Sequence, residues 1–421
     1  MKVKHQSGIA AVGIAAAVML VLSACGAPAG PPSSSAPPPA PGSSSAAAPA
    51  PGSDVPDKPS KPVDLNIMDV AGNLQLTQSM IDSYVAAHPD IIKSVTYDKG
   101  TAPDLPGKLK AQQDAGRVQI DLVLTGTDAL ASGIQQGLYL PIADTFKDRL
   151  PNMANYIDPA KNMQTLAQGQ GVVVTYYPSG PLLEYNPAKV TTPPTTPDEL
   201  LAWAKANPGK FGYARPANSG PGRTFLMGLP YILGDKDPKD PVNGWEKTWA
   251  FLKDLGQYIP MYPTGTGPTM ENLGNGTWDM IASTTGWDIN PRVLGTVPAD
   301  FKITSFKGFT WVTDAHYAVI PKGVDVDKQS AIILLINDML TPQQNAKAYD
   351  KGYFYPGPAV KGADLSLAPQ ESQDAINKFG RPEYADLIAN NPTALPLDAA
   401  TMVTAYKMWD EQVGAGKFKT S

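Results

Sequence analysis

From residue 63 onwards, short apolar runs alternate with longer segments in which apolar residues recur at helical spacing. The short runs predict β-strands at residues 63–70, 95–97, 120–126, 171–177, 182–187, 211–215, 277–283 and 317–321. The longer segments predict helices at 73–88, 105–116, 128–136, 328–339, 342–349 and 399–412, and helix starts near 198 and 225. Strands that alternate with helices at this spacing predict an α/β fold with mostly parallel sheets flanked by helices.

The ends of the predicted strands point to a first group of candidate site residues. Ligands of parallel sheets bind beyond the carboxyl ends of the strands. Asp69 lies near the end of the first predicted strand, a glycine turn leads from there to Asn73, and Thr125 lies near the end of the third predicted strand. We therefore expect Asp69, Asn73 and Thr125 to line a pocket.

The first residues of the chain have the pattern of a secretory signal. Lys2 and Lys4 precede an almost unbroken apolar run over residues 9–22, which is too short to span a bilayer comfortably. The run ends in Leu-Ser-Ala before Cys25, and this motif resembles the lipobox of bacterial lipoproteins. The resemblance implies that residues 1–24 are removed and that Cys25 carries lipid, which would anchor the chain at the outer face of the cell membrane. An ordinary signal peptide with a chance cysteine is the alternative.

A segment of unusual composition follows. Residues 25–62 consist mainly of Pro, Ala, Ser and Gly, with no aromatic residue and no apolar periodicity. Such a segment buries too little apolar surface to offset the entropy of ordering it. We expect a disordered tether, either a simple spacer or one that crosses a thick cell wall; the simple spacer is the preferred interpretation.

Composition excludes several functional classes. Of 421 residues, 42% are hydrophobic and 17% charged, and the formal net charge is −5 without a cluster of Lys and Arg, so we expect no nucleic-acid partner. One cysteine and three histidines argue against Cys-rich zinc sites, disulfide scaffolds and Cys–His catalytic pairs. The Gly-x-Ser-x-Gly, His-Glu-x-x-His and Ser-x-x-Lys motifs are missing, and we expect neither an enzyme nor a cofactor or metal.

Several long motifs carry a family resemblance that covers residues 63–421. They are PTTPDELLAWAKANPG at 194–209, FGYARP at 211–216, GPGRTFL at 220–226, and YAVIPKG and LTPQQ within 314–344. These motifs resemble the bacterial extracellular solute-binding proteins of ABC importers, family 1, and most of all the YnjB-like branch. The resemblance implies a two-lobed, periplasmic-binding-protein-like (type II) clamshell that closes on a small solute and delivers it to a permease. It also implies lobes at 63–186 with 311–355 and at 187–310 with 356–421, and a monomer.

The motif around 220 supplies a second group of candidates. Gly222, Arg223 and Thr224 lie at a predicted helix start, where exposed N–H groups and the helix dipole suit an anionic or carbonyl group. Arg215, a few residues earlier, adds a fork-shaped donor. The alternative is a tight turn that only begins a helix, with Arg223 in solvent.

Aromatic and acidic residues form the third group. Trp287 and Asp288 follow a predicted strand together with Thr285, and Trp311 and Asp314 lie on the return path between the lobes. Flat rings and carboxylates suit a cationic or polyhydroxyl solute. The crossover residues Tyr176 and Tyr177 are expected to close the wall. For each of these aromatic residues, core packing is the alternative.

The identity of the solute stays open at this stage. The acidic and aromatic residues favour an organic cation, whereas Arg215 and Arg223 favour an anion, and a zwitterion would satisfy both. Sugar or iron receptors of the same class are alternatives; Tyr353 and Tyr355 would face one side of a strand as a ferric pair, if that segment is a strand. A glycan-acting lipoprotein enzyme, with Asp279 and Asp288 as paired carboxylates, is the competing class. His88 is expected to be structural, and His316 either satisfied or part of a pocket wall.

Overall fold

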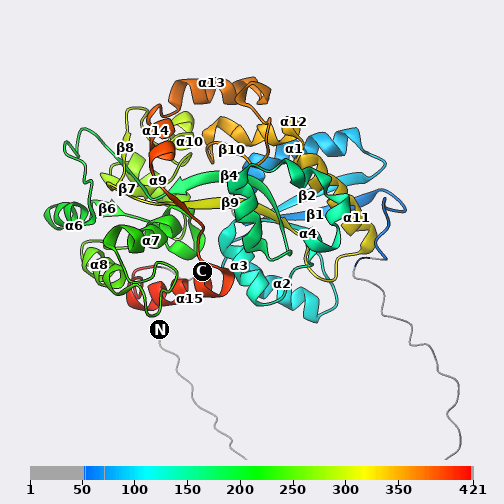
Figure 1. Cartoon of the computed structure of the whole chain (residues 1–421), viewed down its shortest axis with the longest axis horizontal. Helices are drawn as coiled ribbons and strands as arrows, with labels where there is room; N and C mark the ends of the chain where they lie inside the picture. Colours follow the sequence, from blue (N-terminus) through cyan, green and yellow to red (C-terminus); the bar gives the residue numbers. More distant parts are fainter. Residues whose placement is uncertain (1–51, 53, 71, 419–421) are drawn as a thin grey trace, which may run out of the picture. The chain divides into compact units, whose positions relative to one another are not determined.

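The computed structural model of the chain describes residues 52, 54–70 and 72–418. All of these residues belong to one compact unit, Ala50–Ser421 (Figure 1). The expected signal peptide (1–24), the expected lipidation site Cys25 and most of the expected tether (25–62) lie outside the described residues. Within the described part, no helix combines the length and apolar content needed to cross a membrane.

The first lobe is built on a seven-stranded sheet whose strand order is β10-β4-β9-β3-β1-β2, with β11 pairing with β9. Strand β1 pairs in parallel with both β2 and β3, whereas β9 runs antiparallel to β3 and β4. The strands are β1 (Val63–Asp69), β2 (Ile92–Lys99), β3 (Leu122–Thr125), β4 (Val172–Gly180), β9 (Trp311–Val319), β10 (Gly357–Pro358) and β11 (Thr393–Ala394).

The second lobe contains a four-stranded sheet in the order β6-β7-β5-β8. Only β6 and β7 pair in parallel; β5 runs antiparallel to both of its neighbours. The strands are β5 (Leu182–Tyr185), β6 (Phe211–Gly212), β7 (Met280–Ser283) and β8 (Lys302–Thr304). Both sheets are therefore mixed. The expectation of mostly parallel sheets is wrong, because strands that enter or leave a lobe insert antiparallel to the rest.

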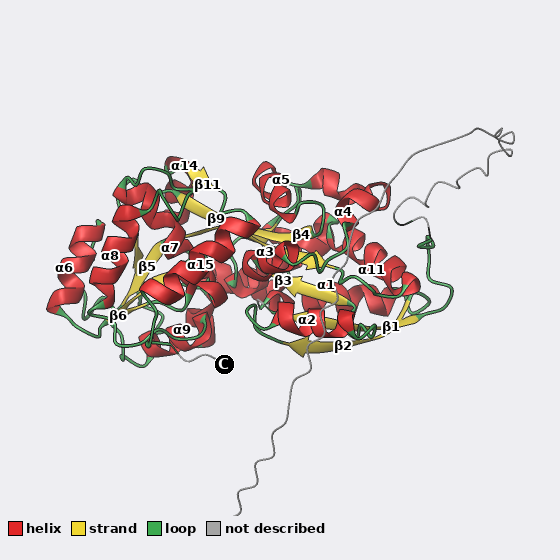
Figure 2. Ribbon diagram, turned by 90° about the horizontal axis from the view of Figure 1, so that it is seen from below, coloured by secondary structure: helices red, strands yellow, loops and turns green. Residues whose placement is uncertain are grey.

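Two long strands connect the lobes. The chain leaves the first sheet at the end of β4 and enters the second sheet at β5, and β9 makes the return crossing (Figure 2). Strand β9 begins in the core of the second lobe with Trp311 and Val312 and ends in the core of the first with Ala318 and Val319. Gly180–Pro181 is a cis peptide between β4 and β5. Both crossing strands thus run beneath the space between the lobes.

The crossings fall somewhat differently from the expected lobe limits. Strand β5 pairs within the second sheet, although the sequence placed residues up to 186 in the first lobe. Strand β10 pairs with β4, and Ala359, Val360 and Ala363 pack in the first core, although residues from 356 were placed in the second lobe. In both cases the pairing of a short strand decides to which lobe the segment belongs, and its partner strand is distant in the sequence.

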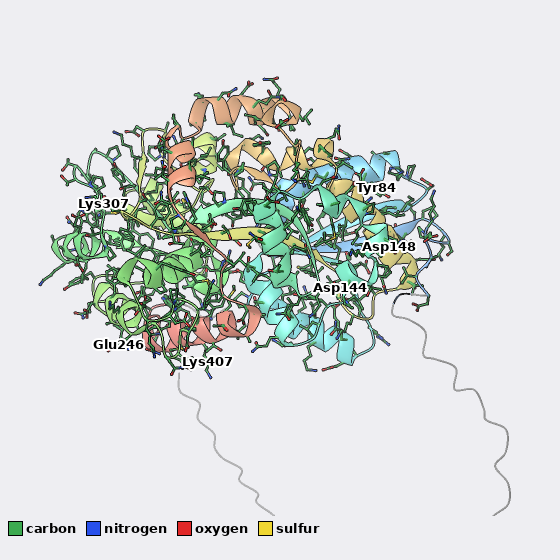
Figure 3. The ribbon with its side chains drawn as sticks, in the orientation of Figure 1. Tyr84, Asp144, Asp148, Glu246, Lys307 and Lys407 are labelled. Carbon is green, nitrogen blue, oxygen red and sulfur yellow. The ribbon has the colours of Figure 1, made fainter. Side chains whose placement is uncertain are left out.

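Helices cover each sheet and bury their apolar faces on it. Those of the first lobe are α1 (Asn73–Ala87), α2 (Leu105–Asp114), α3 (Thr127–Gln135), α4 (Ile142–Thr145), α5 (Asp158–Gln164), α11 (Val326–Met339) and α12 (Pro342–Asn345). Those of the second are α6 (Pro197–Ala206), α7 (Gly220–Leu233), α8 (Glu246–Gly256), α9 (Thr266–Gly274), α10 (Asn290–Leu294), α13 (Gln370–Phe379), α14 (Glu383–Asn390) and α15 (Ala399–Gln412). Charged side chains such as Glu246 and Lys407 lie on the outside of these helices (Figure 3).

Side-chain caps explain where several helices begin. The Thr196 hydroxyl accepts from the Glu199 N–H at the start of α6, and the Glu199 carboxylate accepts from the Thr195 N–H in return. Ser219 caps α7 by accepting from the Gly222 N–H at 3.2 Å. Such caps satisfy N–H groups that have no partner within the helix.

The last residues of the expected tether contact the first lobe. Val55 packs against the first core, and the Asp57 carbonyl accepts from Arg149 at 3.0 Å. The Ser60 N–H donates to Asp327 at 3.0 Å, at the start of α11. The chain is thus held against the folded unit a few residues before β1.

Candidate functional site

A cleft of about 240 Å³ opens between the two lobes, above the crossing strands. Both lobes and both crossing strands contribute to its walls. The lining residues are Asp69, Val70, Gly72, Lys99, Gly100, Gly126, Asp128, Tyr177, Asn218, Ser219, Gly220, Arg223, Gly265, Thr266, Gly267, Trp287, His316, Tyr353 and Phe354. A larger hollow of about 1070 Å³ beside α4 and α5 is lined by the first lobe alone. Another pocket of about 240 Å³ also touches both lobes, through Ala102 and Asp128 of the first lobe and Tyr406 of the second. The cleft differs from it because residues of both crossing strands, Tyr177 and His316, line the cleft as well.

Asp69 stands at the carboxyl end of β1, where parallel-sheet topology predicts ligand contacts. Its carboxylate accepts from the N–H groups of Asn73 at 3.0 Å and Leu74 at 3.3 Å, at the start of α1. Asn73 itself is fully buried just behind this wall, and neither atom of its side-chain amide has a hydrogen-bond partner among the described residues. Gly72 leaves room for Tyr353, because a Cβ there would stand 2.2 Å from the Tyr353 hydroxyl.

Arg223, on the first turn of α7, lines the cleft and connects the two lobes through ion pairs. Its guanidinium pairs with Asp128 on α3 at 3.3 Å and with Asp314 on β9. Asp314 also accepts from the Tyr177 hydroxyl and, at 2.6 Å, from the Thr127 hydroxyl. The guanidinium is 3% exposed, so it needs these partners to remain charged in a region with little water. One arginine of the second lobe is therefore paired with a helix of the first.

The protonation of this group follows from its burial. Burial raises the pKa of the Asp128 carboxyl and the nearby Asp314 raises it further, while Arg223 lowers it. Burial alone would lower the pKa of Arg223, but Asp314 and Asp128 outweigh it and raise that pKa well above its ordinary value. The guanidinium therefore stays charged and is shared by two carboxylates.

Four helices begin at the cleft. Residues at the starts of α1, α3, α7 and α9 contribute to its lining, and five of them are glycines: Gly72, Gly126, Gly220, Gly265 and Gly267. A helix start carries a partial positive charge and N–H groups without intrahelical partners. Glycine leaves these N–H groups open to a ligand. The cleft thus presents backbone donors on several sides.

Aromatic rings form one wall. Trp287 lies edge-on to Tyr353 with ring centroids 5.1 Å apart, and Phe354 lies 4.6 Å from Tyr177 and 4.5 Å from His316. Burial lowers the pKa of His316 to about 4, so its imidazole is neutral near pH 7. Tyr355 instead stacks on Tyr384 with centroids 5.9 Å apart, and no strand includes Tyr353 and Tyr355. The segment is a loop between Gly352 and Pro356, so the strand that a ferric pair on one face would require is not formed there.

The structure brings four of the expected site residues to the cleft: Asp69, Tyr177, Arg223 and Trp287. Five more are buried directly behind its walls. They are Asn73, Thr125, Gly222, Thr224 and Asp314. Gly222 is there for packing, because a Cβ would stand 2.3 Å from the Ala214 carbonyl oxygen. Thr224 donates to the Gly220 carbonyl within α7 at 3.1 Å, so it supports the helix start without facing the cleft.

The other five expected residues lie away from the cleft. Tyr176 packs in the first core, because neighbouring residues on a strand face opposite sides. Arg215 forms an ion pair with Asp410 at 2.6 Å. The Thr285 N–H donates to the Ser179 carbonyl at 2.9 Å at the crossing. Trp311 is a core residue whose indole N–H donates to the Leu387 carbonyl at 3.1 Å, and Asp288 belongs to a separate buried cluster.

That cluster lies inside the second lobe. Asp288 pairs with Arg381 at 2.7 Å, with Arg292 at 3.8 Å and accepts from the Tyr384 hydroxyl. Glu184 on β5 accepts from the Ser283 hydroxyl at 3.1 Å, and its other oxygen has no partner among the described residues. The cluster ties the loop after β7 to α10 and α14, so Asp288 is a packing residue of this lobe.

Sequence reasoning missed several lining residues. Gly265, Thr266 and Gly267 precede Pro268 just as Gly220 precedes Pro221, and this repeated Gly-Pro helix start was a usable signal. The sequence pattern identifies Asp128 only as the first residue of a predicted helix. Lys99 is the last residue of β2, a strand with many exposed positions, and no local sequence pattern indicates that it lines the cleft.

The fold and its cleft define a two-lobed binding protein of the periplasmic-binding-protein kind, and comparisons with known proteins agree. A family model for bacterial extracellular solute-binding proteins matches residues 79–378. The chain therefore belongs to the bacterial extracellular solute-binding proteins. Among curated protein sequences, no match was found.

Solved structures share the fold. An ABC transporter substrate-binding protein from Bradyrhizobium japonicum is 18% identical, with a TM-score of 0.58, over 83% of this chain and 99% of that one. The spermidine/putrescine-binding protein PotD from Streptococcus pneumoniae is 15% identical, with a TM-score of 0.55, over 82% and 99%. AfuA from Actinobacillus pleuropneumoniae, solved with fructose-6-phosphate, is 14% identical, with a TM-score of 0.59, over 84% and 99%. At such identities the likeness supports the two-lobed fold.

The buried Glu184 predicts a pH dependence of stability. Burial raises the pKa of its carboxyl from 4.5 to about 8. The folded state therefore binds this proton more tightly than the unfolded state, and stability falls as pH rises from about 5 to about 8. Glu184→Gln should remove a decline of up to about 4 kcal/mol between those pH values, measured by urea unfolding. Glu246→Gln, at an exposed position, is the control; an unchanged decline in Glu184→Gln would contradict the prediction.

Proposed function

We propose that this chain is the receptor of an ABC importer, which captures a small polar solute in the cleft and delivers it to a permease in the cell membrane. The observation that carries this proposal is a cleft lined by polar and aromatic groups of both lobes, above the strands that join them. A solute that touches both lobes favours their closed arrangement, because it gains contacts there that an open arrangement lacks. One chain supplies both walls, so a monomer suffices.

The cleft supports a zwitterionic solute. Its charged lining residues are Asp69, Lys99, Asp128 and Arg223, two of each sign. Both acidic side chains already have partners: Asp69 accepts from the start of α1, and Asp128 pairs with Arg223. A solute with only positive charge would leave the helix starts, which favour an anionic group, without a partner. A solute with one charge of each sign matches both halves of the cleft.

The ligands of the structural neighbours differ in charge, so they do not identify the solute of this chain. PotD is named for spermidine and putrescine and Atu4243 for GABA, whereas AfuA was solved with fructose-6-phosphate and AgtB with agropinic acid. The same fold thus holds cations, anions and zwitterions. The choice for this chain depends on its own lining residues.

The arrangement of carboxylates does not favour glycan hydrolysis. Asp288, expected as one of the paired carboxylates, is fully buried and pairs with Arg381 inside the second lobe. A general acid or nucleophile must reach the substrate. Receptor function is therefore the better-supported class.

A thermal-shift screen of the purified protein tests the proposal. The panel holds amino acids and related zwitterions, polyamines, thiamine, sugars, sugar phosphates and ferric salts. A ligand that binds only the folded state should add about 2.7 kcal/mol at 100 times its Kd, which raises the melting temperature visibly. We expect a zwitterion to give the largest rise. A rise with none of these classes, together with hydrolysis of a glycan substrate, would contradict receptor function.

Trp287 should contribute to affinity through its ring. Replacing it by alanine removes an aromatic face from the cleft, and we expect affinity for the screened solute to fall about 5- to 30-fold in calorimetric titration. Trp203→Ala, on α6 away from the cleft, is the matched control. Equal affinities of the two variants would remove Trp287 from the binding site.

We also propose that the protein is anchored at the outer face of the cell membrane through lipid on Cys25. The Leu-Ser-Ala-Cys motif and the family, which is extracellular, support this location. Cys25→Ser should abolish incorporation of a labelled fatty acid and release the protein from the membrane fraction, because lipid chains provide the anchor. Ser23→Thr is a conservative control. Membrane retention of Cys25→Ser would contradict lipid anchoring.

A further inference from the structure

Helices α7 and α9 begin side by side on the second-lobe wall of the cleft. Ser219 at the start of α7 and Thr266 at the start of α9 are linked by a hydrogen bond of 2.8 Å between their hydroxyl groups. Asn218 holds the same corner, because its side-chain amide donates to the Thr264 carbonyl at 2.8 Å. The two helices have 14 and 9 residues, long enough to carry an appreciable dipole. Their first turns therefore form one rigid, positively polarised corner.

The backbone donors of this corner are open. Ser219 takes the N–H of Gly222, but among the described residues no acceptor takes the N–H of Gly220, Thr266 or Gly267. These groups belong to first turns and have no partner within their own helices. A Cβ at Gly267 would meet nothing within 4 Å, and a Cβ at Gly220 would stand 3.4 Å from the Tyr177 hydroxyl. The absence of side chains at Gly220 and Gly267 leaves their N–H groups accessible, and Thr266 between Gly265 and Gly267 also lines the cleft.

An independent feature of the same cleft also lacks a partner. His316 is 2% exposed and lines the cleft, and its Nδ1 atom has no hydrogen-bond partner among the described residues. The centroid of its ring lies 6.2 Å from that of Tyr177, whose hydroxyl group lies close to Gly220 in space. Buried polar atoms in proteins are nearly always hydrogen-bonded. We therefore expect the bound solute to form a hydrogen bond with Nδ1 of this imidazole.

We propose that the first turns of α7 and α9 form a subsite for the carboxylate of the solute, bound by the N–H groups of Gly220, Thr266 and Gly267. This proposal rests on the proposed receptor function and names the chemical class of its solute. The subsite suits a single negative charge, because Arg223 is already shared by Asp128 and Asp314 and leaves Lys99 as the remaining cation of the lining. The opposite end of the solute then faces Asp69 and the aromatic wall.

Acetate tests the subsite without knowledge of the solute. In the full protein, we expect acetate to shift the backbone amide signals of Gly220, Thr266 and Gly267 and the imidazole signals of His316 in a saturable way, as followed by NMR. Sodium chloride at equal ionic strength is the reference, and inorganic phosphate separates carboxylate from phosphate recognition. Weaker shifts with phosphate support the proposal. Stronger shifts with phosphate, or shifts no larger than those with chloride, overturn it.

A matched pair of variants tests whether acetate binds at the start of α9. Gly267→Asp places a carboxylate at the start of α9, where it favours the helix but competes with a bound anion. Gly267→Asn has nearly the same shape without the charge. We expect Gly267→Asp to weaken acetate binding at least tenfold and Gly267→Asn to change it less than threefold. Equal effects of the two variants would overturn the subsite.

The solute screen keeps this proposal separate from receptor function. If a solute binds and its primary amide binds at least tenfold more weakly, both proposals hold. If solute and amide bind equally, receptor function stands and the carboxylate subsite falls. If no solute binds while acetate still shifts the three amide signals, the subsite stands and receptor function is the part that fails.

Discussion

Arg223 reaches from α7 of the second lobe to two carboxylates, Asp128 on α3 of the first lobe and Asp314 on the crossing strand β9. A buried guanidinium requires such partners, and two buried carboxylates require a cation between them. The arrangement of the lobes and the charge of the cleft therefore depend on the same three side chains. Tyr177 and Thr127 complete the set by donating to Asp314.

Around this network, the two lobes offer different chemistry to a solute. The second lobe contributes the starts of α7 and α9, with glycines that leave backbone donors open. The first lobe contributes Asp69 at the end of β1 and Lys99 at the end of β2. A neutral imidazole and several rings fill the side between them. Both lobes therefore contribute helix starts to the cleft, and the charged strand ends Asp69 and Lys99 come from the first lobe.

Much of the fold could be predicted because local patterns determine it. The expected strand at 63–70 and helix at 73–88 correspond to β1 and α1, and the expected helix at 399–412 corresponds to α15. Asp69 and Arg223 were found by general rules on strand ends and helix starts, and both line the cleft. These rules work because neighbouring residues suffice to apply them.

The errors concern contacts between distant parts of the chain. Trp287 and Trp311 look alike in the sequence, yet Trp287 lines the cleft and Trp311 packs beside Phe309 in the second core. Asp288 is neutralised by Arg381, 93 residues further along the chain, and no local pattern indicates that pair. The antiparallel insertion of β4 and β9 likewise depends on which strands meet after the chain has crossed between lobes.

The nine residues of strand β9 have four separate structural roles. Trp311 lies in the second core, Asp314 holds Arg223, His316 lines the cleft, and Ala318 lies in the first core. Adding or removing one residue anywhere in this strand would turn all later side chains to the opposite face. A point substitution can alter one of these roles at a time, whereas a change in length alters several of them together. Among homologues, this strand should therefore vary by substitution alone, while insertions and deletions accumulate in the surface loops.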